Sequence, residues 1–139
     1  DGFLLDSLVI SEELRQFFGD NQTIEKEAIS DLDKGFVSRF KSLVEERMKD
    51  AELNVEDLGR NMGMSRVQLY RKLKSLTNYS PNELLRQMRL KKAASLLASS
   101  DMTVAEIAYE VGFSSPSYFT KCYKEQFGES PTEFLKRRG

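Results

Sequence analysis

The stretch that decides the fold is Gly63–Leu76, G-M-S-R-V-Q-L-Y-R-K-L-K-S-L, which predicts a tight turn followed by a short helix. Three leucines at i, i+4 and i+7 form an apolar stripe that must pack against other helices; they are Leu69, Leu73 and Leu76. The other face carries basic and aromatic side chains: Arg66, Tyr70, Arg71 and Lys74. The major groove of a DNA duplex accepts one helix with such a face, because it offers base acceptors flanked by phosphates. The stretch therefore favours DNA recognition.

A second helix is expected directly before this turn. Asn54 is placed to cap a helix over residues 55–62, and Gly63 stands where a helix often ends in a left-handed residue. Ser65 with Gln68 three residues later has the spacing of a capping box, which starts the next helix. Helix, glycine turn and helix together predict a helix-turn-helix.

Two more helices flank this motif. An earlier helix should run from Phe36 to about Asp50, with one apolar face formed by Phe36, Phe40, Leu43, Val44 and Met48. A later one should begin at Ser80-Pro81-Asn82-Glu83, which combines an N-cap serine, proline at N1 and glutamate at N3. With roughly 16 residues it would span about 24 Å and serve as a spacer.

The pattern then recurs. Residues from Val104 to Phe113 repeat those from Val55 to Met64 at an offset of 49, and the offset becomes 50 from Ser115 onward. Thr103 and Glu106 form another capping box, so the repeat includes the start of its first helix. The chain therefore contains two copies of one helical unit.

The expected fold is all-α, with two helix-turn-helix subdomains joined by a long spacer helix. About seven helices are expected, preceded by a partly helical N-terminal leader. The expected ranges are 1–34 for an acidic leader or linker, 35–79 for the first subdomain, 80–98 for the spacer helix and 99–139 for the second subdomain. The leader is interpreted either as a segment cut from a larger protein or as a dimerising or docking segment, since its apolar residues would be exposed if it stood alone.

Composition excludes several classes of function. The 139 residues, 40% hydrophobic, suffice for one ordinary domain or two small ones. Histidine is absent and Cys122 is the single cysteine, so a His-dependent triad, a zinc site and an internal disulfide are not expected. We expect no enzyme, no metal and no cofactor. No apolar run approaches the roughly 20 residues that cross a bilayer, so no membrane contact and a cytoplasmic location are expected.

The charge is unevenly distributed along the chain. The net charge is −1, but residues 1–34 carry a net charge of −6 and residues 35–139 a net charge of +5. Phosphate binding depends on the local potential rather than on the total. The acidic overall balance therefore does not argue against DNA binding.

Residues Ala105–Pro131, A-E-I-A-Y-E-V-G-F-S-S-P-S-Y-F-T-K-C-Y-K-E-Q-F-G-E-S-P, resemble the AraC/XylS-type helix-turn-helix DNA-binding domain of bacterial transcription regulators. The resemblance covers about Phe36 to Arg138. The first copy, with the spacer segment R-L-K-K-A-A-S-L-L, is similar to the variant at the C-terminus of response regulators and hybrid two-component sensors. The family resemblance implies seven helices and double-stranded promoter DNA as the partner. It also implies contact with RNA polymerase and an upstream receiver or sensor domain. A homodimer of the full-length protein is left open.

The resemblance also implies site residues. Base edges would be contacted by Val67, Tyr70 and Arg71 from the first copy and by Ser117, Thr120 and Lys121 from the second. The DNA backbone and flanking positions would be contacted by Ser65, Arg66, Lys74, Ser80, Asn82, Ser115, Tyr118 and Lys124. Arg71 is the leading candidate, because guanidinium pairs bidentately with guanine.

Several of these residues have plainer interpretations. The lysines and arginines can belong to a solvated helix face, and the serines are helix caps in the first place. On the spacer helix, phosphate contact and simple solubility weigh equally for Arg86, Arg89, Lys91 and Lys92. The helical spacing of the second copy's aromatic residues indicates core, and Cys122 is expected to be a buried filler.

The function predicted from the sequence is sequence-specific binding of double-stranded DNA by a bacterial transcription regulator. Its two recognition helices would enter successive major grooves, and it would activate transcription as the output domain of a two-component system. The alternative is a protein-interaction module that does not read DNA. The acidic leader, its apolar cluster around Phe3–Ile10 and the modest net charge favour this alternative.

Overall fold

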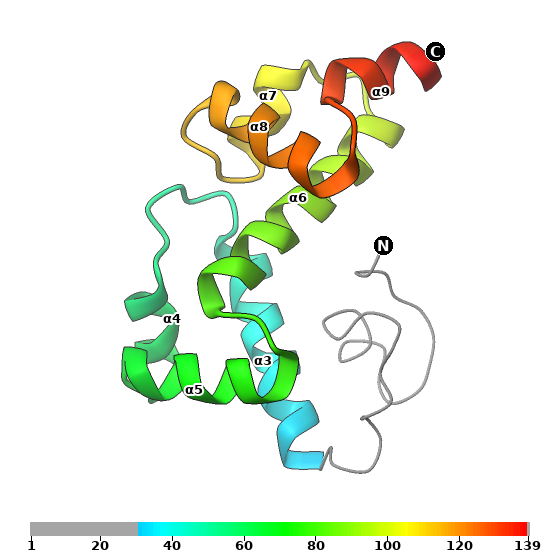
Figure 1. The fold of residues 1–139 in the computed structure, drawn as a ribbon. Coiled ribbons are helices and arrows are strands. Elements are labelled where there is room, and N and C mark those ends of the chain that lie inside the picture. The colour runs from blue at the N-terminus through cyan, green and yellow to red at the C-terminus, as the bar shows by residue number, and fades with distance from the viewer. Residues whose placement is uncertain (1–30, 139) are drawn as a thin grey trace. The chain divides into compact units, whose positions relative to one another are not determined.

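The computed structural model describes residues 31–138, and the predicted leader lies almost wholly outside this range (Figure 1). Within the described residues every regular element is a helix, which confirms the all-α prediction and the expected seven helices. Their bounds are α3 (Asp31–Arg47), α4 (Val55–Asn61), α5 (Arg66–Thr77), α6 (Pro81–Ser99), α7 (Val104–Glu110), α8 (Pro116–Phe127) and α9 (Pro131–Arg138).

The chain divides into two compact units. The first contains the described residues up to Glu45 together with Asn54–Leu84, and so holds most of α3 with α4 and α5. The second contains Glu46–Leu53 and the chain from Leu85 onward, and so holds most of α6 with α7, α8 and α9. The subdomain ranges expected from the sequence stay predictions.

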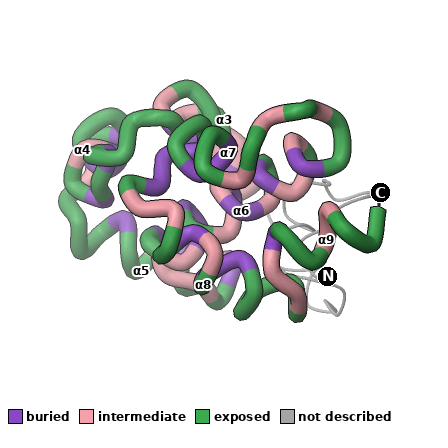
Figure 2. Tube along the Cα trace, turned by 90° about the horizontal axis from the view of Figure 1, so that it is seen from above, coloured by how far each residue is buried: buried purple, intermediate pink, exposed green. Residues whose placement is uncertain are grey.

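The core of the first unit is formed by one face each of α3, α4 and α5. Val37, Phe40 and Val44 on α3 are fully buried, as are Leu58 on α4 and the pair Leu69 and Leu73 on α5. Figure 2 shows buried residues recurring at intervals along the helices, as expected for amphipathic helices with one face in a core.

The sequence pattern misplaced part of this core. Phe36, Leu43 and Leu76 were expected to be buried, but the structure leaves them half-buried. Val37 and Thr77 are buried in addition. An apolar stripe marks a face of a helix within about one residue, and the neighbouring helices decide which side of the stripe becomes the centre.

Thr77 is the buried polar residue at the end of α5. Its hydroxyl donates a hydrogen bond to the Leu73 carbonyl (2.8 Å) and accepts one from the Tyr79 amide (3.1 Å). Because both partners lie in the same turn, the hydroxyl is satisfied without water. The end of α5 is therefore held in place before α6 begins.

The second unit has a more aromatic core. The Phe113 and Phe119 ring centroids lie 5.2 Å apart, and those of Phe119 and Tyr123 lie 5.8 Å apart, distances typical of tilted and edge-on aromatic pairs. The expectation that every aromatic residue of this series is core was wrong for Phe127, which is 40% exposed. Phe127 is the last residue of α8, and its ring centroid lies 4.6 Å from that of Tyr123.

The turns confirm the internal repeat in atomic detail. The Met64 amide donates to the Gly59 carbonyl (2.8 Å), and the Phe113 amide donates to the Ala108 carbonyl (2.9 Å), 49 residues further on. Both turns contain a glycine in the left-handed region: Gly63 at φ 71° and Gly112 at φ 100°. The predicted left-handed turn is confirmed in both copies.

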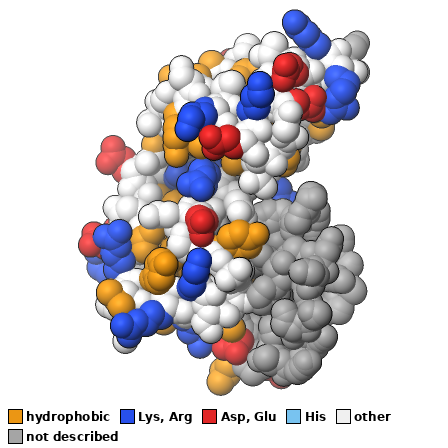
Figure 3. Space-filling model, in the orientation of Figure 1, with side chains coloured by type: hydrophobic (Ala, Val, Ile, Leu, Met, Phe, Trp, Pro, Cys, Tyr) orange, Lys and Arg blue, Asp and Glu red, His pale blue; other side chains and the backbone are white. Residues whose placement is uncertain are grey.

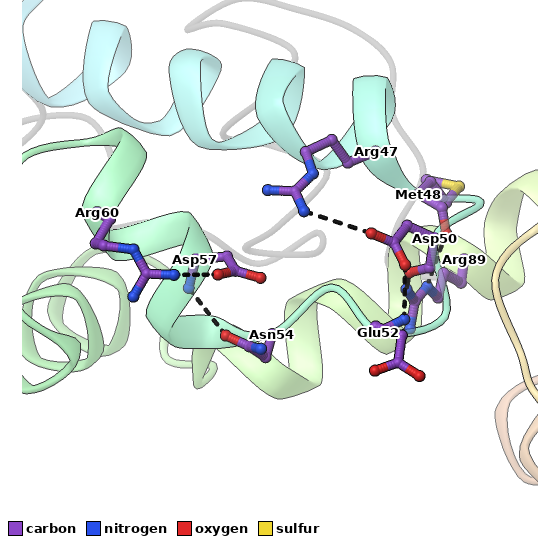
Figure 4. A network of polar contacts seen from close by, with 8 residues as sticks. All are labelled: Arg47, Met48, Asp50, Glu52, Asn54, Asp57, Arg60 and Arg89. Carbon is purple, nitrogen blue, oxygen red and sulfur yellow. Dashed lines mark hydrogen bonds and ion pairs between the residues drawn. The ribbon is translucent and has the colours of Figure 1, made fainter.

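Arg89 joins three segments within the second unit. Its Nε donates to the Met48 carbonyl (3.3 Å) and its Nη2 to the Asp50 carbonyl (2.9 Å), just after α3 ends (Figure 4). Arg89 also lies against the α7–α8 turn, since a Cβ added to Gly112 would be 2.7 Å from its Nε. Burial lowers the pKa of Arg89, and Asp50 opposes that shift. Arg89 therefore has a structural role within the second unit, and phosphate contact by the spacer-helix cations stays a prediction.

Gly112 should be intolerant of any side chain. An added Cβ would lie 2.0 Å from the Met48 carbonyl oxygen, and the φ of 100° is itself strained for alanine. We expect Gly112→Ala to lower the free energy of unfolding of the second unit by about 3 kcal/mol or more. Urea denaturation followed by circular dichroism measures the change.

Gly63→Ala is the matched control, because Gly63 is also left-handed but has open space around its Cβ position. In this variant the free energy of unfolding should fall only by the cost of the backbone strain, about 1–2 kcal/mol. Equal losses in the two variants would contradict the close approach of Met48 to Gly112.

Candidate nucleic-acid interface

The start of α5 is set by a complete capping box. The Gln68 amide donates to the Ser65 hydroxyl (3.1 Å), and the Ser65 amide donates to the Gln68 side-chain oxygen (2.8 Å). These two bonds satisfy amides that the helix itself leaves without partners. The rotation and entry point of α5 are therefore defined before any partner binds.

The exposed face of α5 carries the residues expected to read bases. Val67 is 55% exposed and Tyr70 is 47% exposed, both unusual for large apolar side chains, and Arg71 beside them is exposed as well. Arg66 and Lys74 flank this group and are also exposed. A surface that shows apolar and cationic groups side by side is suited to base edges and phosphates, although base contact itself stays a prediction.

The cations of α5 differ in their partners. Lys72 forms an ion pair with Asp33 (3.3 Å) and lies over the Phe36 ring, 5.2 Å from its centroid, so it braces α5 against α3. Among the described residues, no carboxylate oxygen lies within ion-pair distance of the cations expected to contact DNA: Arg66, Arg71 and Lys74. Figure 3 shows Lys and Arg side chains interspersed with exposed hydrophobic ones on the visible face of the molecule.

A small hollow of about 110 Å³ adjoins the start of α5. It is lined by Asn54, Val55, Glu56, Arg66 and Asn82. Arg66 and Asn82 come from the first turns of α5 and α6, where unpaired amides favour anions, while the Glu56 carboxylate opposes them. The structure thus brings together two of the predicted backbone-contact residues, Arg66 and Asn82, and Ser80 caps the helix that carries the latter.

The equivalent face of α8 is less basic. Ser117 and Lys121 are exposed, but Thr120 is half-buried, which limits its reach. Lys121 forms an ion pair with Glu125 on the next turn (3.4 Å). Lys124, one of the flanking candidates, is exposed at the end of the helix. The second recognition face therefore offers less unpaired positive charge than the first.

Ser115 and Tyr118 lie together at the start of α8. The Tyr118 amide donates to the Ser115 hydroxyl (3.2 Å), which caps the helix. A hydrogen bond with the Cys122 side chain raises the pKa of Tyr118, and the nearby cations Arg86 and Lys121 oppose the shift. The phenol is thus neutral at physiological pH, and half of its side chain faces solvent. Cys122 is buried, as expected.

Sequence reasoning missed Glu125. Its spacing of four residues from Lys121 on a predicted helix is a recognisable signal for an ion pair. The pair is exposed, so its effect on stability is small, but it moderates the charge that α8 presents to a polyanion.

Comparison with known proteins identifies the family. A family model described as a helix-turn-helix domain matches residues 58–137, more than half of the chain. A histidine kinase, P4, from Formosa agariphila is 37% identical over 109 residues, which are 78% of this chain and 8% of the kinase.

Solved structures agree with this match. The C-terminal domain of AraT, a response regulator from Geobacillus stearothermophilus, is 28% identical with a TM-score of 0.70, over 81% of this chain and 89% of that one. The DNA-binding domain of the transcriptional factor AdpA, solved in complex with a target DNA, is 30% identical with a TM-score of 0.68, over 72% and 89%.

The chain belongs to the AraC-type helix-turn-helix family of DNA-binding transcription regulators. It spans only part of the length of its curated relatives: 8% of that kinase and 37% of the Msm operon regulatory protein from Streptococcus mutans. No helix among residues 31–138 has both the length and the apolar character needed to cross a membrane.

The Ser65 cap should contribute to the stability of the fold, independently of any contact between Ser65 and DNA. We expect Ser65→Ala to lower the free energy of unfolding by about 1 kcal/mol, because the Gln68 amide loses its acceptor. Ser75→Ala, at an exposed position inside α5, is the control and should change stability little. Thermal denaturation of both variants measures the difference, and equal melting temperatures would refute the capping role.

Proposed function

We propose that this domain binds promoter DNA sequence-specifically, with α5 and α8 each entering a major groove. The observation that carries this proposal is the face of α5, where Val67, Tyr70 and Arg71 are exposed together on a capped helix with no acidic partner among the described residues. Membership of a family of DNA-binding regulators supports it.

Each base-contact candidate has a distinct chemical role. Arg71 would pair with guanine O6 and N7, and Val67 would contact a thymine methyl group. Tyr70 supplies an exposed ring and a hydroxyl beside them. In the second unit the corresponding candidates are Ser117, Thr120 and Lys121, of which Lys121 would contact guanine or phosphate less selectively.

The remaining candidates would hold the helices on the sugar-phosphate backbone. Long cations reach phosphates, and capped helix starts present free amides to them. The proposed backbone and flanking residues are Ser65, Arg66, Lys74, Ser80, Asn82, Ser115, Tyr118 and Lys124.

Two covalently joined copies would replace the dimer that a single helix-turn-helix needs. Recognition helices spaced about one DNA turn, roughly 34 Å, can read successive major grooves. Because both copies belong to one chain, one molecule would cover both half-sites, whether or not the full-length protein also forms a homodimer.

We further propose that the domain is the output module of a two-component system in the cytoplasm, where it activates transcription through contact with RNA polymerase. Similarity to a histidine kinase and to the C-terminal domain of a response regulator supports an upstream receiver or sensor domain. The domain itself would need no cofactor and catalyse no reaction. A promoter-fused reporter with the full-length gene intact or deleted tests the sign of regulation.

Binding should depend steeply on salt. If about seven phosphates are neutralised, log K should fall with log salt concentration with a slope on the order of −6. Lys74→Gln should weaken binding to every duplex and reduce the slope by about one, because one phosphate contact is lost. Fluorescence anisotropy on a duplex selected from a random library measures both, and an unchanged slope would remove Lys74 from the backbone contacts.

Arg71 should determine one base of the recognition sequence. We expect Arg71→Gln to cost about 1–3 kcal/mol on the selected duplex and to relax preference at one guanine. Replacing that guanine by 7-deazaguanine, which lacks the N7 acceptor, should cost the wild type affinity but leave Arg71→Gln unaffected. A variant that weakens all duplexes equally would show Arg71 to be a phosphate contact instead.

A double substitution distinguishes sequence-specific DNA binding from the alternative, a protein-interaction module. Arg71→Gln with Lys121→Gln removes one exposed cation from each recognition face. A promoter binder should lose the selected duplex, whereas an interaction module should keep its protein partner and lose little affinity for it.

A further inference from the structure

A shallow groove of about 400 Å³ runs beside the recognition helix on its side toward α3. Arg71, Lys72 and Ser75 line it from α5, and Asp33 lines it from the first turn of α3. The half-buried side chains Met64 and Leu76 supply apolar surface. The groove therefore shares Arg71 with the face proposed to read bases.

The groove already holds one acidic group from the chain. Asp33 forms an ion pair with Lys72 (3.3 Å), while Arg71 has no carboxylate partner among the described residues. A second acidic segment would find an unpaired guanidinium next to apolar surface. A carboxylate-bearing peptide with small apolar side chains fits this combination.

The segment directly before α3 has this composition. Residues 20–30 carry three acidic side chains, Asp20, Glu25 and Glu27, against one lysine, and they include two isoleucines and one alanine. Glu27 is four residues before Asp31, where α3 begins, and an extended chain advances about 3.3–3.6 Å per residue, so its carboxylate is within reach of a groove that Asp33 in the first turn of α3 lines. Covalent attachment would give such a short segment a local concentration on the order of millimolar.

We propose that residues 20–30 dock in this groove through their carboxylates and compete with DNA for Arg71. The contact is autoinhibitory: DNA must displace the acidic segment before α5 can use its strongest base reader. Its effect on affinity rests on the proposed DNA binding, but the docking itself does not.

The first test neutralises the segment in the full chain. The double variant Glu25→Gln, Glu27→Gln should bind the selected duplex about three- to tenfold more tightly at low salt, with the gain disappearing at high salt. Glu45→Gln with Glu46→Gln is the matched control, since both residues are exposed on α3 and neither lines the groove. An equal gain in the control would mean that only total charge matters and would overturn the proposal.

The second test traps the docked segment directly. Glu27→Cys with Ser75→Cys should form a disulfide under mild oxidation, and the selected duplex should slow its formation. Glu27→Cys alone and Glu27→Cys with Ser95→Cys, on an exposed position of α6, should not cross-link. No disulfide, or one that DNA does not slow, would overturn the proposal.

The two tests also separate this inference from the proposed function. If no variant binds any duplex, DNA recognition by this domain is wrong, while the disulfide yield without DNA still reports whether the segment docks. If the duplex binds but neither test responds, autoinhibition alone is wrong.

Discussion

The left-handed glycine between paired helices is the constraint on which each unit depends. At Gly63 and Gly112 the chain reverses within a few residues, so that the Met64 and Phe113 amides bond back to carbonyls of the preceding helix. Without a Cβ the reversal has little steric cost, and in the second unit the absent side chain also leaves room for the Met48 carbonyl. The apolar faces of both recognition helices can reach their cores only because this turn holds.

The two copies differ in the residue that precedes the turn and in the length of the connection between their helices. A Cβ on Gly59 would lie 2.7 Å from the Met64 carbonyl oxygen, so the first turn requires glycine there as well. Ala108 occupies the equivalent position in the second copy, where the connection between helices is one residue longer.

Charge is a poor guide to function in this domain until its partners are known. In the sequence, Arg89 is a candidate for phosphate contact, Lys121 is a candidate for base contact, and Lys72 stands next to Arg71. Arg89 instead caps the segment after α3, Lys72 pairs with Asp33, and Lys121 pairs with Glu125. Arg66 and Arg71 keep no acidic partner among the described residues, which makes the first unit the more attractive surface for a polyanion. The acidic residues that precede α3 in the sequence are the competitor that we propose for this surface.

The sequence by itself determined the helices, their caps and the repeat, because these depend on neighbours within four residues: capping boxes, left-handed glycines and the 3.6-residue period. It also identified Arg66, Tyr70, Arg71 and Lys74 as an exposed face, since they lie outside the leucine stripe, whereas Val67 was added only by the family resemblance. Only the tertiary structure decided which residues are central, placing Val37 and Thr77 inside while Phe127 stays partly exposed. The same holds for Arg89 and Lys72, because the partner of a long cation comes from a distant part of the chain, and no local pattern records that distance.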